Sequence, residues 1–379
     1  MIIQSSNVWI CGQFMPAQIE ISGSKITDIR DIGEKEPNED YGDLRIVPGF
    51  IDIHTHGYYG WDTNDATPEG LRRWLKEVPA EGVTGLCPTT ITQSMDVLSK
   101  ALKNAATVAK EDLPGAEILG IHLEGPFLDN VYKGAQPEQY IIRPDVEIFK
   151  TLQKEAEGMI KVITMACEHD EGYRLTEYCA SHGVLVSQGH SGTTYAGAVM
   201  ACAHGASSMT HVYNGMSGFK HREPGLVGAA LRLSDCYGEV ICDGNHSDIN
   251  ALRIFYNAKG KDHAVMVSDS LNLKGYPAGT RILFGGNEIE IVPDGSAHLV
   301  STGGLAGSTL RINRGLALLV QKAGVPFDAA LNSCTLNPAR ALRIDDRKGR
   351  IRTGYDADIT VLDDNYEVVQ TYARGRKCL

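Results

Sequence analysis

Histidine, aspartate and glutamate side chains recur where apolar runs of the chain end. His54 and His56 close the run GFIDIHTH, Glu124 lies in HLEGPF, and Asp269 ends HAVMVSDS. Because residues two apart on a strand face the same side, His54 and His56 can reach one metal ion. Imidazole and carboxylate groups suit Zn, Fe, Mn or Co, so the pattern predicts a divalent-metal site.

Two further histidines complete the expected ligand set. His190 ends the run VLVSQGHS and His211 lies in SSMTHVYN. With Glu124 they supply one carboxylate and two imidazoles, which leaves room for a water molecule. Asp269 is expected to take the proton of that water, although a carboxylate there also fits the N-cap of a following helix. No lysine ends the third or fourth apolar run, so Glu124 must bridge if two ions bind.

The apolar runs alternate with helical segments such as PEGLRRWLKEV and DVLSKALKNAATVAK. This alternation is typical of βαβ units and predicts a parallel sheet. Eight candidate strands can be counted, the number that closes a (β/α)8 barrel. Chemistry in such barrels lies at the carboxyl ends of the strands. The groups expected there are His54, His56, Glu124, His190, His211, His246 and Asp269.

Both ends of the chain differ in pattern from the middle: they contain short runs of alternating polar and apolar residues, typical of strands, separated by turn residues. We therefore expect an α/β protein with two units. Residues 1–48 and 350–379 would form a small β-sandwich domain, and residues 49–349 would form the metal-dependent (β/α)8 barrel that carries the chemistry.

The composition limits the class of protein. The 36 Lys and Arg residues against 47 Asp and Glu residues give a net charge of −11. Binding to nucleic acid or to an anionic membrane is not expected, because such proteins cluster Lys and Arg to neutralise phosphates. No run approaches the roughly 20 apolar residues that span a bilayer, and the first ten residues lack the basic stretch of a signal peptide. A cytoplasmic location is therefore expected.

The nine cysteines are scattered along the chain and never spaced as CxxC. This spacing predicts neither a disulfide framework nor a cysteine zinc site. Most of the cysteines are expected to be small buried apolar residues.

A few polar residues are candidates for substrate recognition. Arg222 and His246 could meet an anionic group, since a guanidinium offers forked donors to phosphate, although a loop arginine is commonly a solvated surface residue. Asn214 either hydrogen-bonds a sugar hydroxyl or simply ends its strand. The adjacent glycines of STGGLAGS allow the backbone to approach a ligand closely, as they also do in many tight turns.

Taken in order, these motifs resemble those of the N-acetylglucosamine-6-phosphate deacetylases of the amidohydrolase superfamily. The matching segments run from about residue 47 to 312, and the closing GRIRTGYDADITVLD resembles a segment common to the superfamily. HxH with the closing segment identifies only the superfamily, whereas HLEGPF, HVYNGM and HREPG together narrow it to the deacetylases. The full series is PGFIDIHTHG, HLEGPF, KGAQP, GHS, HVYNGM, HREPGLVG, DGNH, VSDS and GGLAGS.

The resemblance implies roles for individual residues. Glu124, His190 and His211 resemble the main metal ligands, and Asp269 resembles the catalytic acid and base. Some members lack the HxH pair and use one ion, while others keep it and bind two, so the resemblance implies one or two divalent ions here. Gln136 stands where part of the family has His, and Gly215 stands where Ala is frequent. Substrate contacts are implied for Ala135, Gln136, Asn214, Gly215, Arg222, Asp243, Gly244, Asn245, His246, Leu305, Ala306 and Gly307.

The resemblance also implies a reaction. A homodimer would hydrolyse the acetamide of N-acetylglucosamine-6-phosphate, a small phosphorylated amino sugar, to acetate and glucosamine-6-phosphate. The galactosamine epimer is the main alternative substrate. Cyclic-amide hydrolases such as dihydroorotases usually need a bridging lysine that is missing here. A non-catalytic barrel is disfavoured by the intact ligand set.

Overall fold

The structure is a computed structural model that describes all residues from 1 to 379. Eight parallel strands form the predicted barrel, and each strand pairs with its neighbour from β6 round to β16. A backbone hydrogen bond of 2.9 Å from Asp269 N to His54 O links the last strand to the first. The strands are β6 (Phe50–Thr55), β9 (Val83–Thr90), β11 (Ile121–Glu124), β12 (Ile160–Met165), β13 (Leu185–Gln188), β14 (Ser208–Met209), β15 (Tyr237–Ile241) and β16 (Ala264–Val267), with the short β10 (Glu117–Ile118) beside β9.

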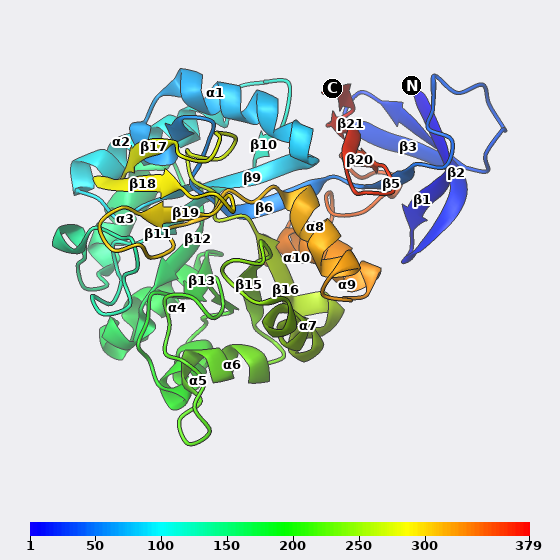
Figure 1. Cartoon of the computed structure of the whole chain (residues 1–379). Helices are drawn as coiled ribbons and strands as arrows, with labels where there is room; N and C mark the ends of the chain where they lie inside the picture. Colours follow the sequence, from blue (N-terminus) through cyan, green and yellow to red (C-terminus); the bar gives the residue numbers. More distant parts are fainter.

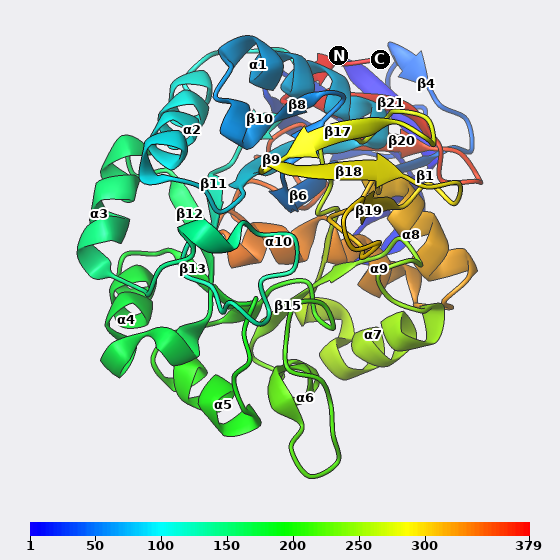
Figure 2. The same ribbon diagram turned by 60° about the vertical axis from the view of Figure 1, so that its left-hand side comes forward.

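Helices surround the barrel, and Figure 2 shows them as an outer ring. Several begin at a polar cap: the Asp145 carboxylate, for example, accepts backbone N–H bonds at the start of α3. The main apolar core of 72 buried residues lies largely between strands and helices. The helices are α1 (Pro68–Glu77), α2 (Met95–Val108), α3 (Val146–Glu155), α4 (Arg174–Ser181), α5 (Tyr195–Ala203), α6 (Gly225–Arg232), α7 (Ile249–His263), α8 (Ile312–Gln321), α9 (Phe327–Ser333) and α10 (Leu336–Ala341).

The two chain ends meet in one sheet beside the barrel, where Figure 1 draws them in blue and red. The sheet encloses a core of 12 buried residues that is separate from the barrel core. The predicted fold class is confirmed, while the division at residues 48 and 350 stays a prediction. In sheet order the strands are β22 (Arg376–Lys377), β21 (Val368–Ala373), β20 (Ile359–Leu362), β5 (Arg45–Pro48), β1 (Ile2–Ile10), β2 (Gln13–Ser22) and β3 (Lys25–Arg30), with β4 (Glu39–Asp40) beside β1.

An additional three-stranded sheet lies between β16 and α8 in the chain and was not predicted as a separate element. It consists of β17 (Arg281–Phe284), β18 (Asn287–Ile291) and β19 (Ala297–Leu299). Its apolar face packs on Ile91 and Leu271, which belong to loops at the carboxyl ends of barrel strands. This small sheet therefore covers part of the barrel mouth, as Figures 1 and 2 show.

A network of buried and partly buried charges joins the terminal sheet to the barrel. Lys348, whose side chain is 1% exposed, lies with its Nζ 2.8 Å from Glu117 Oε2 on β10 and 3.3 Å from Asp356 Oδ2. It also pairs with Asp358, two residues before Thr360 of β20. Arg347 forms two hydrogen bonds to Glu117, of 2.8 and 3.1 Å. We refer to these five residues as the junction network.

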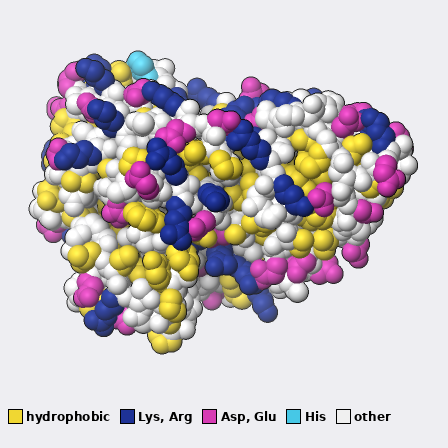
Figure 3. Space-filling model, turned by 90° about the horizontal axis from the view of Figure 1, so that it is seen from above, with side chains coloured by type: hydrophobic (Ala, Val, Ile, Leu, Met, Phe, Trp, Pro, Cys, Tyr) yellow, Lys and Arg dark blue, Asp and Glu magenta, His cyan; other side chains and the backbone are white.

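The surface gives no sign of a basic binding face on the side that Figure 3 shows, where Lys and Arg side chains alternate with Asp and Glu. None of the helices is both long enough and apolar enough to cross a membrane.

Candidate active site

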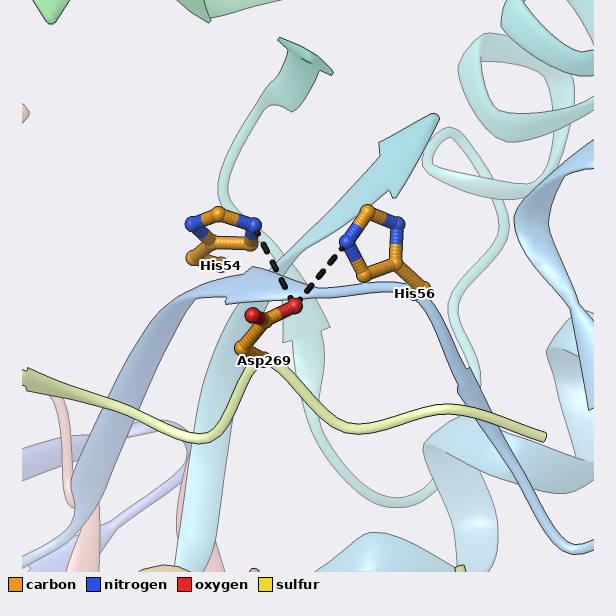
Figure 4. Close-up of side chains that lie close together, drawn as sticks. All are labelled: His54, His56 and Asp269. Carbon is orange, nitrogen blue, oxygen red and sulfur yellow. Dashed lines mark ion pairs between the residues drawn. The ribbon is translucent and has the colours of Figure 1, made fainter. Parts of the chain in front are cut away.

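His54, His56 and Asp269 come together at the carboxyl ends of β6 and β16. Asp269 Oδ1 lies 3.5 Å from His54 Nε2 and 3.1 Å from His56 Nε2. Figure 4 shows both rings turned toward the carboxylate. No helix starts directly after Asp269, since the next one is α8 at Ile312, so the N-cap interpretation of this residue is wrong.

Glu124 connects this group to the other two predicted ligands. Its Oε1 lies 3.1 Å from His190 Nε2 and 3.3 Å from His211 Nε2. The same carboxylate is 3.5 Å from His54 Nε2 and 3.2 Å from His56 Nε2. The structure thus places all six side chains in one buried cluster, with Glu124 shared between its two halves.

The backbone turns sharply where the cluster is built. His190, His211 and Asp269 have φ values of 47°, 31° and 49°, in the left-handed region that residues other than glycine rarely adopt. Such conformations cost on the order of 1 kcal/mol each and concentrate at functional sites. Here they follow the ends of β13, β14 and β16, where they direct the side chains into the mouth.

Each of three histidine rings is held through its Nδ1 atom. His190 Nδ1 lies 2.9 Å from the carbonyl oxygen of Tyr132, and His211 Nδ1 lies 3.0 Å from that of Asn214. His54 Nδ1 lies 2.9 Å from the buried carboxylate of Glu239 on β15. Each of these oxygen atoms accepts a hydrogen bond from Nδ1–H. Nε2 is therefore the atom that faces the centre of the cluster.

The charges of the cluster depend strongly on one another. Burial alone would raise the pKa of Asp269, but the positive charges of His54 and His56 outweigh it and lower the pKa to about 2. The pKa of Glu124 is likewise held well below its ordinary value. In turn, contacts with Asp269 and Glu124 overcome the effect of burial and raise the pKa of His56 to about 9. Without a cation, the cluster therefore holds protons between its imidazoles and carboxylates, and a metal ion would replace them.

The donor set fits one or two divalent ions. His54 Nε2 is buried and has no hydrogen-bond partner, although buried polar atoms in proteins nearly always have one. His190 Nε2 and His211 Nε2 face each other at 3.1 Å. The cluster divides into two groups, and within each group the three ligand atoms lie within 4.8 Å of one another. One group is His54, His56 and Asp269, and the other is Glu124, His190 and His211. Imidazole and carboxylate ligands in these numbers suit Zn, Fe, Mn or Co.

A cavity of about 180 Å³ opens directly above the cluster. Phe284 of β17 forms part of its wall, with its ring 5.5 Å from that of His56 in an edge-on arrangement. The predicted substrate contacts that line this cavity are Ala135, Gln136, Asn214, Gly215, His246, Leu305, Ala306 and Gly307.

The other four predicted contacts do not line it. Asp243 instead binds His246 Nδ1 at 2.7 Å, while Gly244 and Asn245 are exposed beside it. Arg222 is exposed in the loop that precedes α6.

Gln136 has a structural partner as well as a place on the cavity wall. Its amide Nε2 donates to Glu124 Oε2 at 2.7 Å, and its Oε1 accepts from the backbone N–H of Thr92 at 2.7 Å. The side chain therefore helps to hold the shared carboxylate in position.

Three residues of the site were not predicted from the sequence. Glu239 was detectable as the only charged residue in the apolar run YGEVI. His122 lies two residues before Glu124 on the same strand, and its ring is 4.5 Å from that of His54. Burial and the neighbouring charge of His54 lower its pKa well below the ordinary value, so His122 is neutral. Phe284 carried no signal, because its strand was not recognised.

The comparisons with known proteins agree with this arrangement. The model of the Amidohydrolase family matches residues 45–378. The N-acetylglucosamine-6-phosphate deacetylase of Bacillus subtilis (strain 168) is 39% identical over 364 residues, which cover 94% of this chain and 91% of that protein. The N-acetylgalactosamine-6-phosphate deacetylase of Escherichia coli O157:H7 is 32% identical over 331 residues and 87% of each chain.

Solved structures are similar over the whole chain. The N-acetyl-D-glucosamine-6-phosphate deacetylase of Mycobacterium smegmatis, solved in complex with N-acetyl-D-glucosamine-6-phosphate, superposes with a TM-score of 0.94 at 26% identity, covering 100% of this chain and 99% of that one. The N-acetylglucosamine-6-phosphate deacetylase of Thermotoga maritima gives a TM-score of 0.90 at 28% identity, with the same coverage. The chain therefore belongs to the amidohydrolase family and, within it, to the N-acetylglucosamine-6-phosphate deacetylases.

Proposed function

We propose that this protein hydrolyses the acetamide of N-acetylglucosamine-6-phosphate and releases acetate and glucosamine-6-phosphate. The observation that carries the proposal is the shared position of Glu124, which contacts imidazoles of both halves of the cluster beneath a cavity lined by polar and apolar residues. The relatives named for this activity support the choice of substrate.

One or two divalent ions would be held by the six side chains of the cluster. Glu124 with His190 and His211 would form one site, and His54 with His56 and Asp269 would form the other. When bound, such an ion lowers the pKa of a water molecule and polarises the carbonyl oxygen of the substrate. Gln136 and Glu239 keep the ligands in place through their hydrogen bonds to Glu124 and His54.

Asp269 moves the proton. As a carboxylate, it can accept a proton from the attacking water. It then donates that proton to the sugar nitrogen, because an amine leaves as a neutral molecule and not as an anion. The hydrogen bond from Ser308 N to Asp269 O, at 2.7 Å, fixes the backbone of this residue during both transfers.

The cavity wall divides into polar and apolar parts that suit an acetylated sugar. Phe284, Leu271 and Leu305 offer apolar surface, whereas Asn214 and the backbone at Gly307 offer hydrogen-bonding groups. This division lets the wall contact the acetyl methyl group and the hydroxyl groups of one ligand.

His246 is proposed to meet the phosphate. It is the only cationic side chain on the cavity wall outside the metal cluster, since no Lys or Arg lines the cavity. Burial opposes its charged form, but the contact with Asp243 outweighs burial and raises the pKa of His246. Arg222 lies outside the cavity of its own chain, so its predicted phosphate contact requires movement of its loop or presentation by a second copy. We propose a homodimer in the cytoplasm as the working form, with the barrel of residues 49–349 as its catalytic unit.

The test is acetate release by metal-quantified protein from three sugars side by side: N-acetylglucosamine-6-phosphate, its galactosamine epimer and unphosphorylated N-acetylglucosamine. We expect the highest kcat/KM for the first. A preference for the epimer would keep the mechanism and change the substrate, a possibility that the 32% identical galactosamine relative makes concrete. No release from any sugar by protein that holds metal would contradict the proposal.

Metal dependence is tested separately. Treatment with a chelator should abolish acetate release, and adding back Zn, Fe, Mn or Co should restore it and show which ion serves best. The Glu124→Ala and His190→Ala variants should lose bound metal. Full metal content with normal turnover in either variant would contradict the ligand assignment.

A further inference from the structure

Two cysteine thiols lie in contact on the outer part of the barrel. Cys202 in the last turn of α5 and Cys236 just before β15 place their Sγ atoms 3.2 Å apart. Cys202 is partly exposed, whereas Cys236 is buried. Both are free thiols, as are the other seven cysteines of the chain. No other pair of cysteines forms a thiol–thiol contact of this kind, so the position of this pair needs an explanation.

A buried lysine lies beside the pair. Lys259 of α7 is 4% exposed, and its Nζ donates hydrogen bonds to the carbonyl oxygens of Cys236 at 2.6 Å and Leu233 at 2.8 Å. It forms no ion pair with a carboxylate within 4.0 Å. A buried ammonium without an ion-pair partner is costly, and the negative charges that would favour it are those of Cys236 and Cys202, followed by the carboxylate of Asp235.

The lysine is held there by the packing of α7 on β15. Gly238 of β15 has no side chain, and a Cβ atom at this residue would lie 3.1 Å from Lys259 Cε and 2.9 Å from the ring of Phe255. The glycine therefore makes room for the lysine stem. Burial lowers the pKa of Lys259 to about 8, and its positive charge favours the thiolate form of Cys236, whose pKa is lowered mainly by the hydrogen bond from Cys202.

We propose that Cys202 and Cys236 are an oxidisable dithiol that forms a reversible intrachain disulfide on reaction with a peroxide, with Lys259 stabilising the reacting thiolate. One thiolate attacks a peroxide oxygen, which breaks the O–O bond and gives a sulfenic acid and hydroxide. The second thiol then forms the S–S bond and displaces the sulfenic oxygen as water. In sum, two thiols and one hydrogen peroxide give one disulfide and two waters.

The disulfide would lie at the end of the barrel opposite the metal cluster. Cys236 precedes β15, whereas the cluster lies at the carboxyl ends of the strands. The bond would close a segment with a sequence separation of 34 residues that includes β14 and α6. We therefore expect oxidation to raise the melting temperature by a few degrees and to leave kcat unchanged.

The experiment uses the full-length protein with Cys11→Ser and Cys378→Ser, because these two cysteines are exposed or partly exposed and would react independently. Hydrogen peroxide is added and the protein is digested without reduction. We expect a peptide pair linked through Cys202 and Cys236, a fall of two in the free-thiol count, and full reversal by dithiothreitol. Recovery of both cysteines as free thiols, or of a sulfenic acid on one without a disulfide, would overturn the proposal.

The role of the lysine has its own controls. Lys259→Met should slow disulfide formation severalfold at neutral pH, while Lys259→Arg, which keeps the charge, should restore most of the rate. Cys202→Ser and Cys236→Ser should each abolish the linked peptide and retain acetate release. An unchanged rate in Lys259→Met would remove the lysine from the proposal. None of these measurements depends on which sugar the enzyme deacetylates.

Discussion

Two regions of this molecule bury clusters of opposite charges, and they are completed in different ways. In the junction network, the ammonium of Lys348 is surrounded by carboxylates of Glu117, Asp356 and Asp358. In the metal cluster, His54 Nε2 has no hydrogen-bond partner. The six residues of the metal cluster are all buried, whereas Glu117 and Arg347 of the junction network are partly exposed, and only the junction network is self-sufficient. A cluster whose atoms pair fully acts as structure, whereas one that leaves donor atoms unpaired is arranged for something bound.

The largest effect should come from the residue that moves the proton. Asp269→Asn keeps the size of the side chain and removes its ability to accept a proton, so kcat should fall by about 10³-fold with little change in KM. Acetate release at saturating substrate measures this effect, and metal analysis of the variant controls for loss of ligands. Normal kcat in a metal-loaded variant would exclude Asp269 as the base.

The junction network should show the opposite behaviour. Lys348→Met leaves the carboxylates of Glu117, Asp356 and Asp358 without their shared cation, so the free energy of unfolding in urea should fall by about 3 kcal/mol. Its kcat should stay within twofold of the parent, roughly the scatter of such assays. Lys25→Met is the matched control, because this half-exposed lysine pairs with Asp356 at 2.7 Å and should matter by less than about 1 kcal/mol.

Low pH should reduce the difference in free energy of unfolding between the parent protein and the Lys348→Met variant. Burial raises the pKa values of Glu117 and Asp356, but Arg347 and Lys348 beside Glu117, and Lys25, Lys348 and Arg347 beside Asp356, outweigh it and lower them below the ordinary values of 4.5 and 3.8. Their stabilisation is present above those ordinary values and is lost as the pH falls through the lower folded-state values. Urea unfolding of both proteins from neutral pH to about pH 3 measures the difference in their free energies of unfolding. A difference that stays constant with pH would show that Lys348 acts through packing and not through charge.

A smaller effect on metal binding is expected from Glu239, which contacts the predicted ligand His54. Glu239→Gln weakens the acceptor that orients His54, so metal affinity should fall by about tenfold and kcat should recover at high metal concentration. Competition with a metal-binding dye measures the affinity. Unchanged affinity would mean that the position of His54 is set by the strand alone.

The smallest effect concerns Arg222. Replacing this exposed residue by Ala should raise KM for the phosphorylated sugar by roughly two- to fivefold and leave that for the unphosphorylated sugar unchanged. Equal changes for both sugars would show that Arg222 does not meet the phosphate. No change for either would leave His246 as the phosphate contact.

Much of the barrel was predictable because parallel strands are buried on both faces. Runs such as VTGLCPTT and VITM contain no charged residue, and β9 is buried along its full length. Residues at the ends of such runs converge in any barrel of this kind, which is why the ligand set could be named before its geometry was known.

The remaining features depend on contacts between distant parts of the chain. Glu239 reaches His54 across the barrel although β16 lies between their strands, and no local pattern encodes that contact. The strand of Phe284 has exposed and half-exposed neighbours in RILF, so it lacks the apolar run that marks the barrel strands. Whether Arg222 reaches the cavity depends on the path of a loop, which residue types alone do not determine.

The sheet made from both chain ends has a consequence for synthesis on the ribosome. β5 pairs with β20 through contacts such as Val47 with Thr360, so one edge of β5 has no partner until more than 300 further residues have been translated. At translation rates of about 5–20 residues per second, that wait lasts on the order of tens of seconds. During this time the nascent amino-terminal strands expose an edge that other chains can pair with, which makes this segment the expected site for chaperone protection.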